Sequence, residues 1–151
     1  MKREVADFLQ SHCVGVLATL AADGSPQAAT IFYIFDNEGG LIFKSRATSE
    51  HIIGLEKNSL AAVAVYDHES NYKEKTGVQL KGVVSRITDF SRMSDYIVQY
   101  GKSFEGSLEK FSPVAELISS AASSTLYRFQ VSSFKYTDSA AGIADIEYRT
   151  W

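Results

Sequence analysis

The chain has 151 residues and a mass of 16.6 kDa, which suits one domain spanning residues 1–151. Hydrophobic residues make up 45% and charged residues 22%, and these values exclude a mostly disordered chain. The net charge of -3 argues against non-specific binding to nucleic acid or to an anionic membrane. Cys13 is the only cysteine, so an intramolecular disulfide is excluded, and the three histidines are scattered, so no metal site is expected. No stretch approaches the roughly 18 apolar residues of a membrane span, and the start is a poor signal peptide, so we expect a cytoplasmic protein.

The first part of the chain predicts one helix and then three strands. Helical spacing of apolar residues predicts an amphipathic helix over residues 3–12. Runs rich in β-branched and aromatic residues predict strands over 14–20, 27–35 and 41–45. Turn chemistry separates them at Asp23-Gly24 and within residues 36–40. We therefore expect an antiparallel β-meander.

The rest of the chain alternates helices and strands. A helix over residues 48–58 begins with Thr48 or Ser49 as its N-cap, and Asp89 caps another. In chain order we predict helices over 48–58, 90–101 and 113–121, and strands over 60–66, 78–87 and 124–136. About six mostly antiparallel strands with a few peripheral helices predict a mainly β fold, a small β-barrel.

The segment FKSRATSEH, residues 43–51, carries the most chemistry. A strand ends there and a helix begins, and helix N-termini expose backbone N–H groups and positive dipole charge. Hydroxyls from Ser45, Thr48 and Ser49, with cations from Lys44 and Arg46, would complete a phosphate cradle. The plainer interpretation is an ordinary hydroxyl cap with solvated cations, and spacing alone does not decide between them.

Catalytic motifs are otherwise absent from the sequence. His12 and Cys13 are adjacent and point in different directions, so we expect a buried cysteine rather than a dyad. His51, in the first turn of its helix, is either a neutral polar contact facing a ligand or a solvated residue. We expect His68 to be solvated. Most aromatic residues are expected in the core, including Phe32, Phe35 and Phe43, whereas Tyr148 and Trp151 pack on a partner, over a pocket, or in the same core.

The order of these segments resembles the pyridoxamine 5'-phosphate oxidase-like, flavin-binding split-barrel family. The similar elements are the strand LATLAADGSPQA, the hairpin FDNEGG, the step IFKSRATSEH, the strand LAAVAVY and the later GVQLKGVVSRI. The resemblance covers about residues 5–90, and the closing FQVSSFKYTDSAAGI is similar to a small bacterial subgroup. It implies a six-stranded antiparallel split barrel that forms a homodimer with FMN between the subunits.

The resemblance also implies where the cofactor contacts the chain. The phosphate positions match Lys44, Ser45, Thr48 and Ser49, with His51 close by. The flavin ring would lie against the second strand, mainly through backbone groups, at Ala29, Thr30, Ile31 and Phe32. Gln79, on the fifth strand, would point into the same cleft.

Three departures bear on function. Glu50-His51 stands where typical members have Arg-Lys, and alanines occupy a second-strand stretch that often carries an arginine. Unless Lys44 and Arg46 compensate, FMN would bind weakly, the ligand would differ, or the site would be empty. The C-terminal Arg-x-His of a true pyridoxamine phosphate oxidase is missing, since Tyr148-Arg149 is not that motif.

Three functions therefore stay open. The first is an FMN-dependent oxidoreductase acting on an unknown small molecule. The second is a non-enzymatic dimer that binds or senses flavin, heme or another planar anion, which the Glu50-His51 departure favours. The third is a structural dimer with no ligand. None of them assigns a catalytic side chain.

Overall fold

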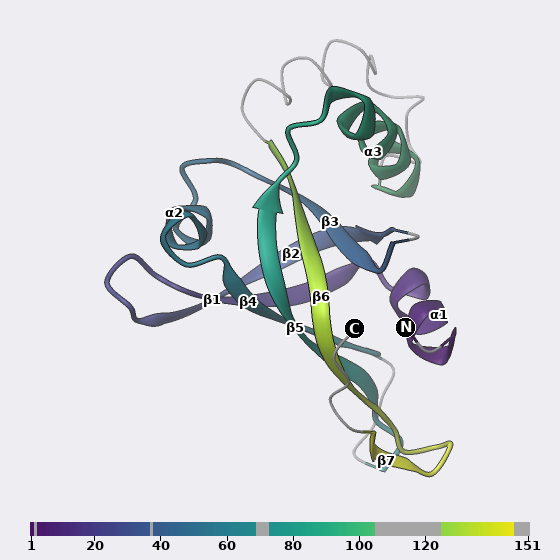
Figure 1. The fold of residues 1–151 in the computed structure, drawn as a ribbon. Helices are drawn as coiled ribbons and strands as arrows, with labels where there is room; N and C mark the ends of the chain where they lie inside the picture. Colours follow the sequence, from purple (N-terminus) through teal and green to yellow (C-terminus); the bar gives the residue numbers. More distant parts are fainter. Residues whose placement is uncertain (2, 37, 69–72, 105–124, 147–151) are drawn as a thin grey trace.

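In the described part of the chain, six antiparallel strands close into a barrel and three helices lie around it (Figure 1). The computed structural model describes residues 1, 3–36, 38–68, 73–104 and 125–146. The strands are β1 (Val14–Leu20), β2 (Pro26–Phe35), β3 (Gly40–Ser45), β4 (Leu60–Tyr66), β5 (Thr76–Arg86), β6 (Thr125–Asp138) and the short β7 (Ile143–Ile146). The helices are α1 (Arg3–Ser11), α2 (Glu50–Lys57) and α3 (Phe90–Phe104).

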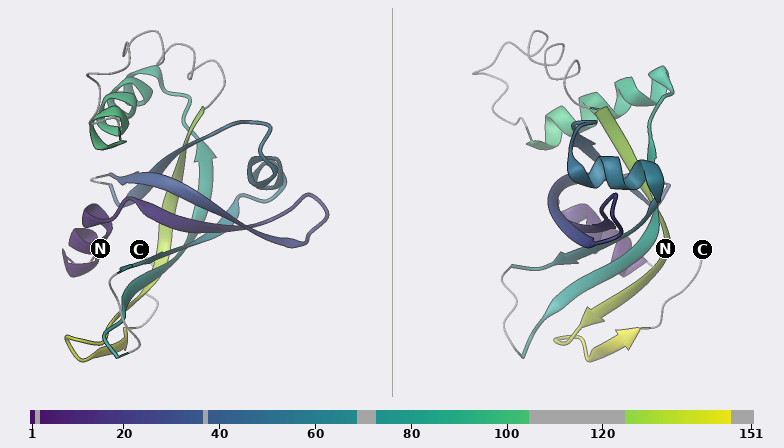
Figure 2. Two further views of the ribbon diagram at one scale, coloured as in Figure 1. Left: turned by 180° about the vertical axis from the view of Figure 1, so that it is seen from behind. Right: turned by 90° about the vertical axis from the view of Figure 1, so that its left-hand side faces the viewer.

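The strand order is β3-β2-β1-β4-β5-β6-β7, and pairing of β3 with β6 closes the barrel. β5 and β6 run side by side past the barrel, where β7 adds to β6 (Figure 2). This confirms the predicted antiparallel meander and the six-stranded barrel. β7 was not expected from the irregular sequence of the tail. The predicted helix 113–121 and the residues Tyr148 and Trp151 lie outside the described residues.

The barrel interior holds the main hydrophobic core. Alternate residues of the strands point inward, and α1 adds Val5, Phe8 and Leu9, as its helical spacing predicts. Burial of Phe43 confirms a core position, and Phe35 packs against the core while only partly buried.

A second hydrophobic cluster lies outside the barrel, beneath α3. Its buried members are Ile34, Ile42, Ile87, Leu126 and, from α3 itself, Tyr96. Partly buried residues of α3 pack against it: Met93, Ile97, Tyr100 and Phe104. α3 is thus fastened to the outer surface of the barrel over β2, β3 and β6. Its N-terminus is capped as predicted, because Asp89 Oδ1 accepts from the amides of Ser91 and Arg92.

Two burial predictions are wrong. Cys13 is exposed because it lies in the link between α1 and β1, where only its backbone is engaged, accepting from the Tyr33 amide at 2.8 Å. Phe32 was expected in the core, but strand alternation puts it on the outward face, with 54% of the residue exposed. His12, by contrast, stacks on Phe8 rather than pairing with Cys13.

α2 lies against β1 at unusually short range. A Cβ atom at Gly54 would overlap the carbonyl oxygen of Leu20, so only glycine allows this approach. The glycine that weakens helix propensity is therefore the contact point that seats α2 on the barrel. No helix in the described ranges is long and apolar enough to cross a membrane.

Candidate functional site

The ladder between β2 and β3 is incomplete. β3 pairs with β6 along its whole length, from Gly40 to Ser45, but pairs with β2 only over Tyr33–Phe35. Beyond Phe43, β3 follows β6 and leaves β2. In the described part of the chain, β2 residues 26–32 therefore have a ladder partner only on the β1 side.

Backbone geometry shows which amide and carbonyl groups of β2 face the side where pairing with β3 has ended. The Tyr33 amide donates toward β1, to the Cys13 carbonyl, so Tyr33 uses the β1 side. Because strand residues alternate sides, the amide and carbonyl groups of Thr30 and Phe32 point the other way, toward the missing part of the ladder. The Phe32 carbonyl there accepts from the hydroxyl of Tyr100 on α3, at 3.1 Å. β2 thus presents an open backbone edge at the predicted ring-binding stretch.

The outward side chains next to this edge lie in a row across four strands. Thr30 is opposite Val16, Val16 is opposite Ala64, and Ala64 is opposite Gln79. Directly opposite residues share a face, so Thr30 and Gln79 lie on one outward surface, as the resemblance implied. Both are exposed.

The other two ring-binding candidates point into the barrel. Ile31 is 4% exposed and belongs to the core, and Ala29, on the same face of β2, is partly buried. Their amide and carbonyl groups face β1, as those of Tyr33 do. At the open edge, the backbone groups and the outward side chains both belong to Thr30 and Phe32.

Three of the predicted cofactor-site residues form a contact group, which we call the Ser45 group: Ser45, Ser49 and His51. Ser45 ends β3, Ser49 is the N-cap of α2, and His51 lies in its first turn. Ser45 Oγ lies 2.8 Å from Nε2 of His51 and donates to Ser49 Oγ at 3.3 Å. With a proton on Nε2, the imidazole donates to Ser45, and both distances fit a relay of hydroxyl groups. The Ser49 side chain makes no cap bond to the helix, so this relay ends at a hydroxyl beside the helix N-terminus.

The Ser45 group holds a neutral imidazole. Burial lowers the pKa of His51 below its ordinary value, so the ring is uncharged at neutral pH. Neutral His51 donates one hydrogen bond but supplies no positive charge. This chain therefore replaces one cation of the family pattern with a polar contact.

The other predicted residues between the end of β3 and the start of α2 do not join the Ser45 group in the contacts described. Lys44 is opposite Leu126, so it starts from the side of β3 that α3 covers, whereas Ser45 starts from the other. Thr48 and Glu50 are exposed. Because the Glu50 side chain is exposed, solvent weakens any repulsion between its carboxylate and a nearby anion. Its carbonyl accepts from Gln27 Nε2 at 3.3 Å, which ties α2 to β2.

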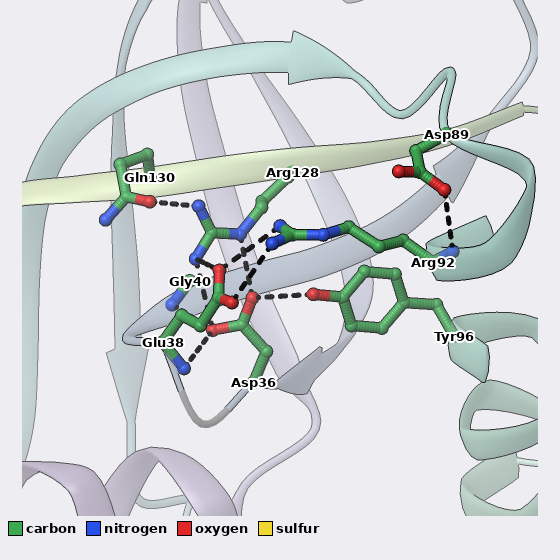
Figure 3. A network of polar contacts seen from close by, with 8 residues as sticks. All are labelled: Asp36, Glu38, Gly40, Asp89, Arg92, Tyr96, Arg128 and Gln130. Atoms are coloured by element: carbon green, nitrogen blue, oxygen red, sulfur yellow. Dashed lines mark hydrogen bonds and ion pairs between the residues drawn. The ribbon is translucent and has the colours of Figure 1, made fainter.

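A polar network between β2, β3, β6 and α3 was missed from the sequence (Figure 3). Arg128 Nε donates to Asp36 Oδ2 at 2.7 Å, and their side chains are 16% and 4% exposed. Tyr96 donates its hydroxyl to the same carboxylate oxygen at 3.1 Å. Glu38 joins from the hairpin, pairing with Arg128 and with Arg92 of α3. The network ties α3 to the β2–β3 hairpin.

The network also explains Gly40. A Cβ atom there would lie 2.8 Å from Arg128 Nε, so glycine leaves room for the guanidinium. Burial acts to lower the pKa of Arg128, but the hydrogen bond and charge of Asp36 outweigh it, and the net shift is upward. Burial and the adjacent Asp36 raise the pKa of the Tyr96 hydroxyl. Both groups keep their protons at neutral pH, which makes this a structural network.

The sequence model of the pyridoxamine 5'-phosphate oxidase family matches residues 1–137. The chain belongs to this family. The match spans all six barrel strands except the last residue of β6, and it includes both the open edge of β2 and the Ser45 group. No curated protein is significantly similar in sequence.

Solved structures with the same fold come from several bacteria. A conserved hypothetical protein of Mycobacterium tuberculosis superposes with a TM-score of 0.78 at 19% identity, covering 97% of this chain and 91% of that one. A heme storage protein, HutZ, of Vibrio cholerae gives 0.65 at 21%, covering 86% and 89%. An FAD-binding protein of Mesorhizobium loti gives 0.67 at 19%, covering 89% and 91%. At these identities the likeness establishes the split-barrel fold, and the fold carries both flavin and heme binders.

The residues of this family member fit FMN. A flavin ring edge carries carbonyl acceptors and an N–H donor, and the open edge of β2 offers amide and carbonyl groups in alternation. The Ser45 group ends in a hydroxyl at a helix N-terminus, which suits a phosphate. In the described ranges no cluster of His, Cys, Asp and Glu side chains is suited to hold a metal ion.

Proposed function

We propose that this member of the pyridoxamine 5'-phosphate oxidase family binds FMN and is a flavin-dependent oxidoreductase of a small molecule. The open backbone edge of β2 is the observation that carries the proposal. An open sheet edge presents amide and carbonyl groups that readily take new hydrogen-bond partners, and a planar heterocycle with a polar edge would supply them. Bound FMN supplies hydride or electron transfer, and the protein supplies binding and orientation.

Two parts of the chain would bind the two ends of the cofactor, the flavin ring and the phosphate. Within the predicted stretch 29–32, the backbone of Thr30 and Phe32 would orient the ring, and Gln79 lies on the same outward surface as Thr30. The Ser45 group would receive the phosphate, with Thr48 beside it. Lys44 starts from the opposite side of β3, so its charge would reach the phosphate only around the strand end. The substrate is unassigned, because Tyr148-Arg149 does not match the substrate motif of the true oxidase and lies outside the described residues.

The outward face of β1, β2, β4 and β5 supports a homodimer. Small residues occupy its centre: Ala18, Ala28, Ala62 and Ala64. Large apolar residues surround them with exposures of 41–66%: Val14, Leu20, Phe32, Leu60, Tyr66 and Val83. Such a face is apolar enough to be buried against a second copy, which would bring two β2 edges together.

Dimerisation is expected to fail when a charge enters this face. We expect Ala64→Arg to give a monomer, because an unpaired guanidinium would be buried between the subunits. Ala140→Arg, in the exposed turn before β7, is the matched control and should leave the dimer intact. Light scattering distinguishes the 16.6 kDa chain from its dimer. A monomeric native protein would contradict the proposal.

FMN binding is expected to depend on the Ser45 group. The native protein should take up FMN and show a flavin absorption spectrum. Ser45→Ala combined with Ser49→Ala should weaken binding about tenfold or more, since a hydrogen bond to a charged group contributes about 1.5–3 kcal/mol. The control pair is Ser59→Ala with Ser85→Ala, both at exposed positions. If the native protein does not bind FMN, the flavin function is contradicted. If the double variant binds FMN as tightly as the native protein, the phosphate does not bind at the Ser45 group.

Heme or another planar anion is the second candidate. His51 favours it, because a neutral imidazole is the form that ligates iron, and a heme storage protein shares the fold. The same spectrum decides: a Soret band that is lost in His51→Ala supports heme. A purely structural dimer predicts neither spectrum.

We propose a cytoplasmic location for the protein, where the exposed Cys13 would stay reduced.

A further inference from the structure

The Ser45 group contains hydroxyls and an imidazole but no positive charge. Burial lowers the pKa of His51, so its ring stays neutral at neutral pH. Lys44 starts from the other side of β3, and Arg46 lies in the exposed link before α2. A cation beside hydrogen-bond donors strengthens the binding of a phosphate. A cation from another element would therefore complete a phosphate site here.

Strand pairing brings polar residues of β5 and β6 to the end of the barrel where β3 leads into α2 (Figure 1). Ser45 is opposite Thr125, the first residue of β6. One row further into the wall, Phe43 is opposite Tyr127, and Tyr127 is opposite Arg86, the last residue of β5. Opposite residues share a face, and so do residues two positions apart on a strand. Because Phe43 and Tyr127 belong to the barrel core, all five residues start from the inner face.

Tyr127 adds a hydroxyl without a partner. The residue is 6% exposed, and within the described ranges its hydroxyl makes no hydrogen bond. Burial raises the pKa of this hydroxyl, while the charge of Arg86 acts to lower it and the charge of Glu56, in the last turn of α2, acts to raise it. Both charges therefore lie close to the Tyr127 hydroxyl. A nearly buried polar group of this kind calls for a partner, and a ligand oxygen would supply one.

Arg86 carries a positive charge at this end of the inner face. It is exposed, and it makes no hydrogen bond or ion pair with any residue in the parts of the chain that the structure describes. A guanidinium is always charged and carries five donors in a plane, which suits phosphate oxygens. By strand spacing, its Cα lies about 10 Å across the sheet and about 7 Å along it from that of Ser45. The arginine side chain extends from there, so a phosphate on the Ser45 group comes within the range of about 10 Å over which charges act in ordinary buffers.

We propose that Arg86 supplies the positive charge of the phosphate site, and that the hydroxyls of Thr125 and Tyr127 lie beside it. This inference rests on the proposed flavin function, because the phosphate is that of FMN. The start of α2 lacks the two cations that the resemblance implies there, and the end of β5 provides one instead. Glu56 opposes the effect, since its carboxylate competes with the phosphate for Arg86. Arg86 is thus a specificity-determining residue, which favours a flavin with a phosphate over the same ring without one.

Binding of FMN and of riboflavin tests the proposal, because the two flavins share a ring and differ by the phosphate. Fluorescence titration of the whole protein gives both dissociation constants. The native protein should bind FMN more tightly than riboflavin. Arg86→Gln should weaken FMN binding about tenfold, the lower end for a hydrogen bond to a charged group, and leave riboflavin binding unchanged. Arg86→Lys keeps the charge and should restore most of the FMN affinity.

Two further variants serve as controls. Arg3→Gln removes the same charge from α1, where its side chain is 92% exposed, and should bind both flavins like the native protein. Glu56→Gln should tighten FMN binding by up to about fivefold, the most that an exposed charge pair contributes, with riboflavin binding unchanged. Opposite effects of two exposed substitutions at one end of the barrel cannot come from a general loss of stability. Equal affinity of the native protein for both flavins, or equal losses of the two in Arg86→Gln, would overturn the proposal.

Inorganic phosphate, followed by phosphorus NMR, separates this inference from the proposed function. Phosphate that binds the native protein but not Arg86→Gln, with no FMN uptake by either, supports the anion site and contradicts the flavin function. FMN that binds the native protein and Arg86→Gln equally well supports the flavin function and overturns the role of Arg86. A native protein that binds neither phosphate nor FMN overturns both.

Discussion

Asp36→Ala is expected to lower the free energy of unfolding by about 3–5 kcal/mol, the cost of leaving a buried charge without its partner. Arg128 is 16% exposed and donates to Asp36 at 2.7 Å. Removing the Asp36 carboxylate leaves this guanidinium between β6 and the hairpin with only the half-exposed Glu38 as a charged partner. Tyr96 loses its acceptor in the same step. Since small domains are stable by only about 5–15 kcal/mol, urea unfolding should register the change as a large shift of the midpoint.

Glu38→Ala is the matched control for Asp36→Ala. Glu38 contacts Arg128 and Arg92 in the same network, but its side chain is 55% exposed. Solvent screens such pairs, and the loss should stay below about 1 kcal/mol. Similar midpoints for the two variants would show that burial does not distinguish the carboxylates.

The strands were predictable because their burial alternates locally. LAAVAVY forms β4 over Leu60–Tyr66, as predicted, and within it Val63 and Val65 point inward. The third strand differs by one residue from its predicted start, and the helix before β4 ends at Lys57. These elements depend on neighbouring residues, so a single sequence contains enough information to place them.

The barrel wall network was not predictable from the same pattern. Asp36 looks like a turn residue, and Arg128 lies 92 positions away in the sequence. Nothing in the local spacing of either residue indicates the other. Phe32 fails for a related reason, since alternation assigns it a face but does not say that this face is the outer one.

The candidate site was also predictable only in part, because some of its residues are close in sequence and others are brought together by strand pairing. Ser45, Ser49 and His51 lie within seven positions, so a strand-to-helix step was enough to indicate that they would meet. Thr30 and Gln79 share a surface only through the registers of β1 and β4, which the sequence does not specify. Their common face came from the family resemblance, and the register of the barrel explains it. The open edge of β2 likewise depends on where β3 stops pairing with β2 while it continues to pair with β6.

Gly54→Ala is expected to destabilise the protein by about 3 kcal/mol, the upper end of what overpacking costs. At an ordinary helix position this substitution would stabilise by about 1 kcal/mol, so the predicted sign is opposite to helix propensity. The reason is the close contact of α2 with β1. The new Cβ would overlap the Leu20 carbonyl oxygen, which belongs to the backbone and cannot rotate away. α2 would shift from β1 and carry Ser49 and His51 with it. FMN affinity should therefore fall together with the unfolding midpoint.

Gly24→Ala separates this contact from a general effect of losing a glycine. Gly24 has a φ of 86° with no atom within 4 Å of an added Cβ, so its substitution costs only the left-handed backbone strain of about 1–2 kcal/mol. It lies in the β1–β2 turn and should leave FMN affinity unchanged. If Gly54→Ala were as stable as the native protein, α2 would not be seated by this contact. If it lost stability yet bound FMN normally, the phosphate would not depend on the position of α2, and the Ser45 group would not be its site.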